Sequence, residues 1–203
     1  MADIQLPPRY EAVHAAGGTL LYVALGAAWA LVGLLELRPV GTPWINLFLG
    51  VSAAVLFILA MRGFQRATEL PEDEVSEEQQ QERATRSRRS HRVMTAQGVV
   101  ITVISAYLIL TGQQAYIAAA TSLAVGLHFV ALAAVHHTPG EYLLGGLMIA
   151  VAAATMYWIP RMPTIPDGAM NIVAGFGTAI ILWLGSLVRL VRLERELVRA
   201  TEN

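Results

Sequence analysis

Six long apolar runs constrain this chain more than any other feature of its sequence. Each is 18 to 23 residues long and contains no Asp, Glu or Arg. About 20 such residues in a helix cross the roughly 30 Å of bilayer hydrocarbon. The sequence therefore predicts an all-α protein, a bundle of six transmembrane helices that forms one polytopic membrane domain over residues 1–203. The predicted spans are 13–35, 44–61, 93–110, 115–135, 142–159 and 170–188.

The breaks between these runs are mostly rich in charge and proline, which end helices and resist burial in lipid. The shortest break, Gly112 to Gln114, carries no charge. One helix over 93–135 would nevertheless have about 43 residues, too many for a single crossing. We therefore expect two helices with a turn between them.

The composition excludes several classes of protein. Only 14% of the residues are charged and the mean hydropathy is +0.53, against roughly 25% charged residues in soluble domains. This argues against a large soluble catalytic domain and against a disordered chain. The net charge of −1 offers no basic face for nucleic acid. Cysteine and lysine are absent, which excludes thiol and Schiff-base chemistry.

Arginine predicts the orientation, because cytoplasmic loops of membrane proteins carry an excess of positive charge. With six spans, 12 of the 14 arginines fall on the side of the two termini. We therefore expect an inner-membrane protein with both termini in the cytoplasm. On the other side are Arg38 and Arg161, together with a belt of aromatic residues, Trp44, Tyr116, Tyr157 and Trp158.

Glycines predict how the spans pack. Gly17-Gly18, Gly145-Gly146 and Gly175-x-Gly177 lie in apolar runs, where small residues allow close approach of helices. The spans also fit a repeat of three hairpins, first with second, third with fourth and fifth with sixth. A similar spacing from glycine to the polar end of each even span would also arise without a repeat, because every even span ends at the same interface.

The one long polar segment, the predicted cytoplasmic loop 62–92, has its acidic residues first and its arginines last. Ser76 followed by Gln79 has the pattern of a capping box, so a helix is expected from about Glu77 into the third span. The sixth helix is expected to continue as an amphipathic tail, either lying at the membrane surface or contacting another subunit.

The arginine block at the end of this loop is predicted to bind anionic lipid headgroups, at roughly 1 kcal/mol for each arginine near the surface. Recognition of a protein partner or a nucleotide is the alternative. The predicted headgroup residues are Arg83, Arg86, Arg88, Arg89 and Arg92.

His128 is the one ionisable residue well inside a predicted span. It precedes the end of its run by about eight residues, or about 12 Å. Such residues are expensive in lipid and point to function. Three roles are open to His128. It forms a structural hydrogen bond with a neighbouring helix, it relays protons or binds a ligand, or it binds a metal.

A second group of polar residues is expected at the cytoplasmic ends of the spans. Glu11-x-x-His14 has the spacing that places a carboxylate and an imidazole on one metal in helix bundles. A zinc or iron site is one interpretation and solvated helix ends are the other, so no cofactor is assigned. The candidate ligands are Glu11, His14, His136, His137 and Glu141.

Gly126-Leu127-His128-Phe129, followed by Pro139, Tyr142 and Gly145, resembles small uncharacterised bacterial multi-pass membrane proteins with a Gly-x-His-Phe motif. The hairpins are also similar in architecture to six-span acid-stress membrane proteins. These resemblances imply a bacterial inner-membrane protein and carry over no catalytic residue.

Three functions follow as hypotheses. The first is a structural, accessory or stress-related membrane protein that works in a homo-oligomer or with a membrane-protein partner. The second is a carrier or channel for a small neutral solute, with His128 in its path. The third is a membrane metalloenzyme, so the sequence leaves enzymatic activity open.

Overall fold

The described part of the chain is a bundle of long helices. The computed structural model describes residues 9–37, 43–71, 77–136, 138–162 and 168–201. The long helices are α1 (Arg9–Glu36), α2 (Pro43–Thr68), α3 (Glu77–Leu110), α4 (Ile117–His136), α5 (Pro139–Trp158) and α6 (Ala169–Thr201). Two short 3₁₀ helices, η1 (Gln114–Tyr116) and η2 (Ile159–Arg161), join them.

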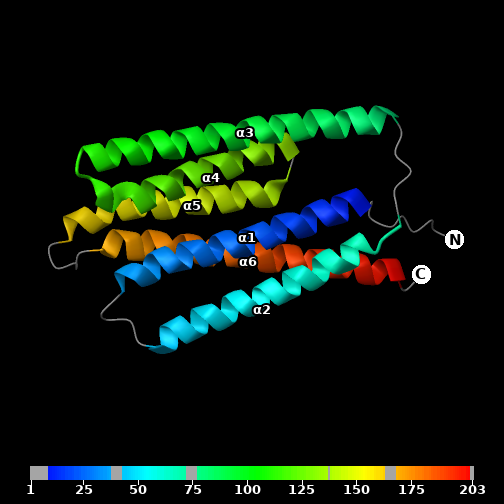
Figure 1. Cartoon of the computed structure of the whole chain (residues 1–203), viewed down its shortest axis with the longest axis horizontal. Coiled ribbons are helices and arrows are strands. Elements are labelled where there is room, and N and C mark those ends of the chain that lie inside the picture. Colours follow the sequence, from blue (N-terminus) through cyan, green and yellow to red (C-terminus); the bar gives the residue numbers. More distant parts are fainter. Residues whose placement is uncertain (1–8, 38–42, 72–76, 137, 163–167, 202–203) are drawn as a thin grey trace.

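Successive helices run in opposite directions along the long axis (Figure 1). One end of the bundle therefore holds the first residues of α1, α3 and α5 and the last residues of α2, α4 and α6. We call it the arginine-rich end. Each of the six long helices contains a stretch that is long and apolar enough to cross a membrane. The predicted number and order of spans are therefore confirmed at the level of helix length and composition.

Local chemistry sets the helix boundaries. Gly112 has a φ of +72°, which only glycine adopts easily, and the N–H of Gln113 donates to the carbonyl of Leu108 at 2.8 Å. This closes α3 and confirms the predicted turn. Pro139 begins α5, at a position where its missing N–H costs nothing.

Most helices extend beyond the predicted spans. α3 starts at Glu77 and continues without a break into the apolar run, as expected, although Ser76 of the predicted capping box lies outside the described residues. The predicted continuation of the sixth helix is also confirmed, because α6 reaches Thr201.

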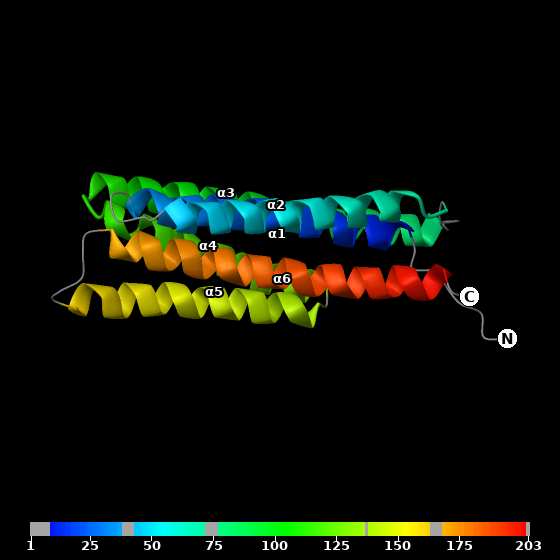
Figure 2. The same ribbon diagram turned by 90° about the horizontal axis from the view of Figure 1, so that it is seen from below.

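The most extensive packing joins α1 to α6 and α4 to α5. Figure 2 shows α6 lying between α1 and α5. The hairpin partners α1 and α2, α3 and α4, and α5 and α6 do contact one another. The two pairs with the most extensive contact, α1–α6 and α4–α5, are nevertheless not hairpin partners. Glycines allow the helices of both pairs to approach closely.

Two glycine contacts bring backbones together. A Cβ added at Gly145 would lie 2.6 Å from the carbonyl oxygen of Gly126, and one at Gly175 would lie 2.6 Å from the amide nitrogen of Gly33. The first contact joins α5 to α4 and the second joins α6 to α1. Gly146, in contrast, has no atom within 4 Å of such a Cβ.

Buried polar side chains add further links. The hydroxyls of Ser122 on α4 and Thr178 on α6 are 2.7 Å apart, and both residues are fully buried. The indole N–H of Trp183 on α6 donates to the carbonyl of Val23 on α1 at 3.2 Å. α2 and α3 lie at the periphery and leave most of their apolar side chains exposed.

Candidate functional site

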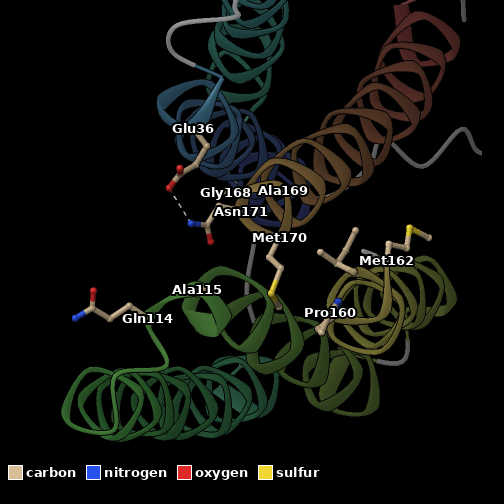
Figure 3. Close-up of a pocket in the computed structure, with 10 residues that line it drawn as sticks. Glu36, Gln114, Ala115, Pro160, Met162, Gly168, Ala169, Met170 and Asn171 are labelled. Atoms are coloured by element: carbon tan, nitrogen blue, oxygen red, sulfur yellow. Dashed lines mark hydrogen bonds between the residues drawn. The ribbon is translucent and has the colours of Figure 1, made fainter. Parts of the chain in front are cut away.

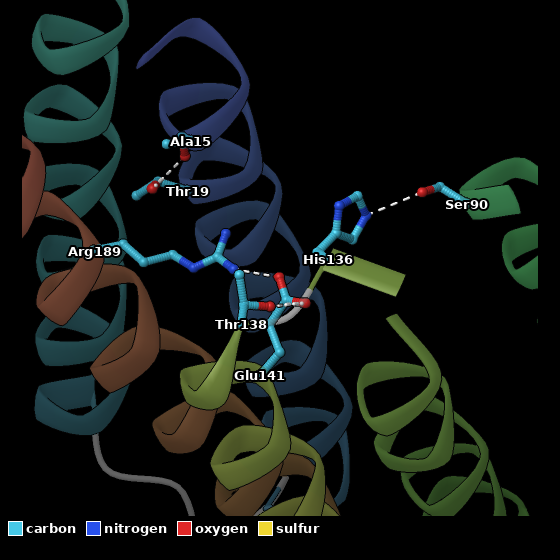
Figure 4. Close-up of polar contacts among 7 residues, drawn as sticks. All are labelled: Ala15, Thr19, Ser90, His136, Thr138, Glu141 and Arg189. Carbon is cyan, nitrogen blue, oxygen red and sulfur yellow. Dashed lines mark hydrogen bonds and ion pairs between the residues drawn. The ribbon is translucent and has the colours of Figure 1, made fainter. Parts of the chain in front are cut away.

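A polar cluster joins three helices near the arginine-rich end (Figure 4). Glu141 lies in the first turn of α5, three residues after Thr138 at the N-cap. The Thr138 hydroxyl donates to one carboxylate oxygen, Oε2, at 2.7 Å. Glu141 is only 8% exposed, so its charge needs a partner inside the protein.

Arg189 of α6 is that partner. Its Nη2 lies 2.5 Å from the other carboxylate oxygen, Oε1 of Glu141. The same guanidinium lies over the ring of Tyr22 on α1, 4.4 Å from the ring centroid. A Cβ added at Gly18 would lie 2.9 Å from Nη1 of Arg189, so this glycine leaves room for the arginine. We call Tyr22, Thr138, Glu141 and Arg189 the three-helix cluster.

This arrangement fixes the position of α5 against α1 and α6. Both carboxylate oxygens of Glu141 have a donor, so this residue is held as a structural anion rather than presented as a base or ligand. Removing one member of a buried ion pair costs about 3–5 kcal/mol, because it leaves the other charge without a partner.

A second cluster lies at the same end and joins α1, α3 and α4. The Ser90 hydroxyl of α3 is 3.0 Å from Nε2 of His136 on α4. The ring of His136 lies 5.9 Å from that of His14 on α1, and Tyr10 stacks on His14 at 6.1 Å. Arg83 of α3 covers the Tyr10 ring at 4.3 Å. These contacts attach the polar part of α3 to the start of α1.

Two of the predicted metal ligands, His14 and His136, therefore lie together. Glu141 instead binds Arg189, Glu11 is exposed, and His137 lies outside the described residues. Among the residues that the structure describes, no group of three His, Cys, Asp or Glu side chains is placed to hold a metal ion.

His128 faces another helix. It is half-buried on α4 beside the Phe129 ring, with ring centroids 6.0 Å apart, and its ring lies against the backbone of Val93 on α3. Its Nδ1 is buried and finds no hydrogen-bond partner among the described residues. Of the three placements open to it, cavity, helix or lipid, the α3–α4 interface is the one observed.

A cavity of about 500 Å³ lies at the opposite end of the bundle (Figure 3). At its edge the Asn171 amide of α6 donates to Oε1 of Glu36 on α1 at 2.8 Å. Met170 points into this space, and Gln114 of η1 marks another edge. His128 is not among the residues that line it.

The predicted headgroup arginines divide into two sets. Arg83 is half-buried over Tyr10. Arg88, Arg89 and Arg92 are exposed, whereas the side chain of Arg86 lies outside the description.

Sequence reasoning did not single out Tyr22, Thr138 or Arg189 as site residues. Thr138-Pro139-Gly140-Glu141 has the spacing of a capping box, a signal that marks the start of α5 but not the ion pair. Arg189 directly follows an apolar run and so looked like an ordinary residue at a span end. No local pattern links it to a glutamate 48 residues earlier.

Comparisons with protein-family models, with curated proteins and with solved structures give no match for this chain. What the fold itself defines is an all-helical chain with six helices able to cross a membrane.

Proposed function

We propose that this chain is a multi-pass protein of a bacterial inner membrane, with the arginine-rich end in the cytoplasm, and that it acts as a structural or accessory protein. Six helices of spanning length and the bias of arginine to one end support the membrane placement. The accessory role is supported by how the buried polar groups are used.

The observation that carries the proposal is that most buried polar side chains of the described residues bind groups of the protein itself, either across two helices or within one. Glu141 binds Arg189 across α5 and α6, and Ser122 binds Thr178 across α4 and α6. Thr19 and Thr155 donate back to the carbonyls of their own helices. A bundle built in this way is a firm membrane body that presents its charged end to lipid or to a partner.

The orientation can be tested directly because the chain has no cysteine. Ser87→Cys on α3 and Gln113→Cys before η1 place single thiols at opposite ends, and both residues are exposed. We expect a membrane-impermeant maleimide to label the second variant in spheroplasts and the first only after lysis. The reverse pattern would overturn the orientation.

The accessory role predicts a phenotype in the native host. Deletion of the gene should increase entry of a membrane-impermeant dye under acid or osmotic stress. The wild-type protein and a Gly146→Ala variant should restore the barrier, whereas Glu141→Ala, which breaks the three-helix cluster, should restore it poorly. An unchanged barrier after deletion, together with a protein that purifies as a free monomer, would contradict the proposal.

A carrier for a small neutral solute is the second candidate, favoured by the cavity at the opposite end. Its edge carries the amides of Asn171 and Gln114, and the carboxylate of Glu36 there already accepts a hydrogen bond from Asn171. Proteoliposomes should then take up glycerol or urea faster than protein-free liposomes, and Ala115→Trp at the cavity wall should slow this uptake. Equal uptake with and without protein would exclude these solutes and leave the accessory role.

A further inference from the structure

We propose that the outward face of α3 binds an anionic phospholipid, with the lipid phosphate on Arg88, Arg89 and Arg92 and an acyl chain along Val99 and Val103. This inference rests on the proposed membrane placement. Of the five arginines predicted to bind headgroups, the proposed site keeps three, and it adds the path of the acyl chain along α3.

The arginines of the bundle differ in what they already bind. Arg189 is paired with Glu141 at 2.5 Å and Arg66 with Glu194 at 2.6 Å, and Arg83 lies over Tyr10. Their charges are directed at groups of the protein itself.

Arg88, Arg89 and Arg92 are exposed, and no described residue pairs with them. From residue 83 to its end, α3 contains no Asp or Glu to neutralise them. These three cations are therefore available to an anion outside the protein.

The face of α3 on which they lie identifies the kind of anion. At about 100° per residue, Arg92, Val99 and Val103 lie on one side of the helix, and the two valines are 58% and 61% exposed. Arg83, Ser90 and Leu108 lie on the other side, toward the protein. The outward face thus changes from cationic to apolar along one continuous helix.

The dimensions fit a phospholipid. Arg88 and Arg92 are one turn apart, about 6 Å along the axis, which matches the thickness of a headgroup layer. Val99 lies about 10 Å beyond Arg92, at the depth of the upper acyl chain. A free phosphate or a soluble nucleotide would use the arginines but would leave the exposed valines without a role.

Fluorescence quenching by lipids with brominated acyl chains tests the site in proteoliposomes. A single Val99→Cys variant carries a fluorophore on the proposed acyl path, and Leu47→Cys on the exposed face of α2 serves as a reference. Brominated phosphatidylglycerol is compared with brominated phosphatidylcholine, and the ratio of their apparent binding constants is the measured preference.

At residue 99 we expect a preference for phosphatidylglycerol of at least about fivefold, the factor that one arginine supplies at about 1 kcal/mol. Arg89→Gln combined with Arg92→Gln removes two of the three arginines and should lower this preference at least about fivefold. Arg66→Gln combined with Arg83→Gln changes the net charge equally and should preserve it. Millimolar inorganic phosphate should not compete.

The remaining outcomes separate the two proposals. If residue 47 is quenched and both lipids quench residue 99 equally, the lipid site is overturned and the membrane placement stands. Quenching at residue 47 but none at residue 99 would show that protein covers α3, which also overturns it. No quenching at either position would refute the membrane placement itself.

Discussion

Two adjacent glycines of α5 provide the sharpest test of how this bundle packs. A methyl group at Gly145 would meet the carbonyl oxygen of Gly126 at 2.6 Å and the backbone nitrogen of Val130 at 3.0 Å. The first distance is about 0.8 Å short of the 3.4 Å at which ordinary contact begins. Since both atoms belong to the backbone, no side-chain rotation relieves the overlap, and α4 and α5 must move apart.

Overpacking of this kind costs about 1–3 kcal/mol. Alanine also gains about 0.5–1 kcal/mol over glycine within a helix. Gly146→Ala is the matched control, because it makes the same chemical change where the added methyl meets nothing within 4 Å. The gain in helix propensity cancels between the two variants, so Gly145→Ala should unfold about 1–3 kcal/mol more easily than Gly146→Ala.

The assay is reversible unfolding in mixed micelles, or steric trapping in bicelles, with the free energy of unfolding measured for both variants. Equal stabilities would refute the reasoning, because they would mean that α4 and α5 are not in backbone contact at Gly145. A less stable Gly146→Ala would show that α5 is rotated about its axis relative to this structure.

Three further changes test other contacts by the same measurement. Glu141→Ala should lower the free energy of unfolding by up to about 3 kcal/mol, because Arg189, whose side chain is only 28% exposed, loses its anion. Glu194→Ala removes a more exposed pair and should change it by about 1 kcal/mol at most. Similar losses in the two variants would contradict the difference in burial between the pairs. Ser122→Ala should cost about 0.6 kcal/mol and no more than about 1.7, the average and the maximum measured for hydrogen bonds between membrane helices. It should cost nothing further in a Thr178→Val background. His128→Leu removes a buried Nδ1 without a partner but also the hydrogen bond of the ring to the backbone of Val93, so the two effects offset and the free energy of unfolding should change by less than about 1 kcal/mol. A larger loss would show that the contact with Val93 is a main link between α3 and α4.

Much of the fold could be predicted from the sequence because long apolar runs bounded by charge and proline define the helices. The six helices, the break at Gly112, the start of α3 at Glu77 and the extension of α6 were all expected, and each is observed. Packing at Gly145 was also expected. The same close packing was predicted for Gly146, yet a Cβ added there would meet nothing within 4 Å.

The candidate site was less accessible to sequence reasoning. His128 was predicted to lie deep within its span, and only the structure places it against α3. Glu141 was grouped with histidines as a metal ligand, and its contact with Arg189 depends on two helices that meet through the fold. A pair of residues so far apart in sequence leaves no periodic signal.

The sequence by itself determined which segments are helices and where their charged ends lie, since the transfer of charge and backbone into lipid is costly enough to dominate every other local preference. Only the tertiary structure decided which helices touch. Bilayer hydrocarbon and a helix interface are both apolar, so hydropathy does not distinguish a face that meets lipid from one that meets protein. Small residues such as Gly126 and a few buried polar pairs make that choice, and their partners are defined only once the helices are packed.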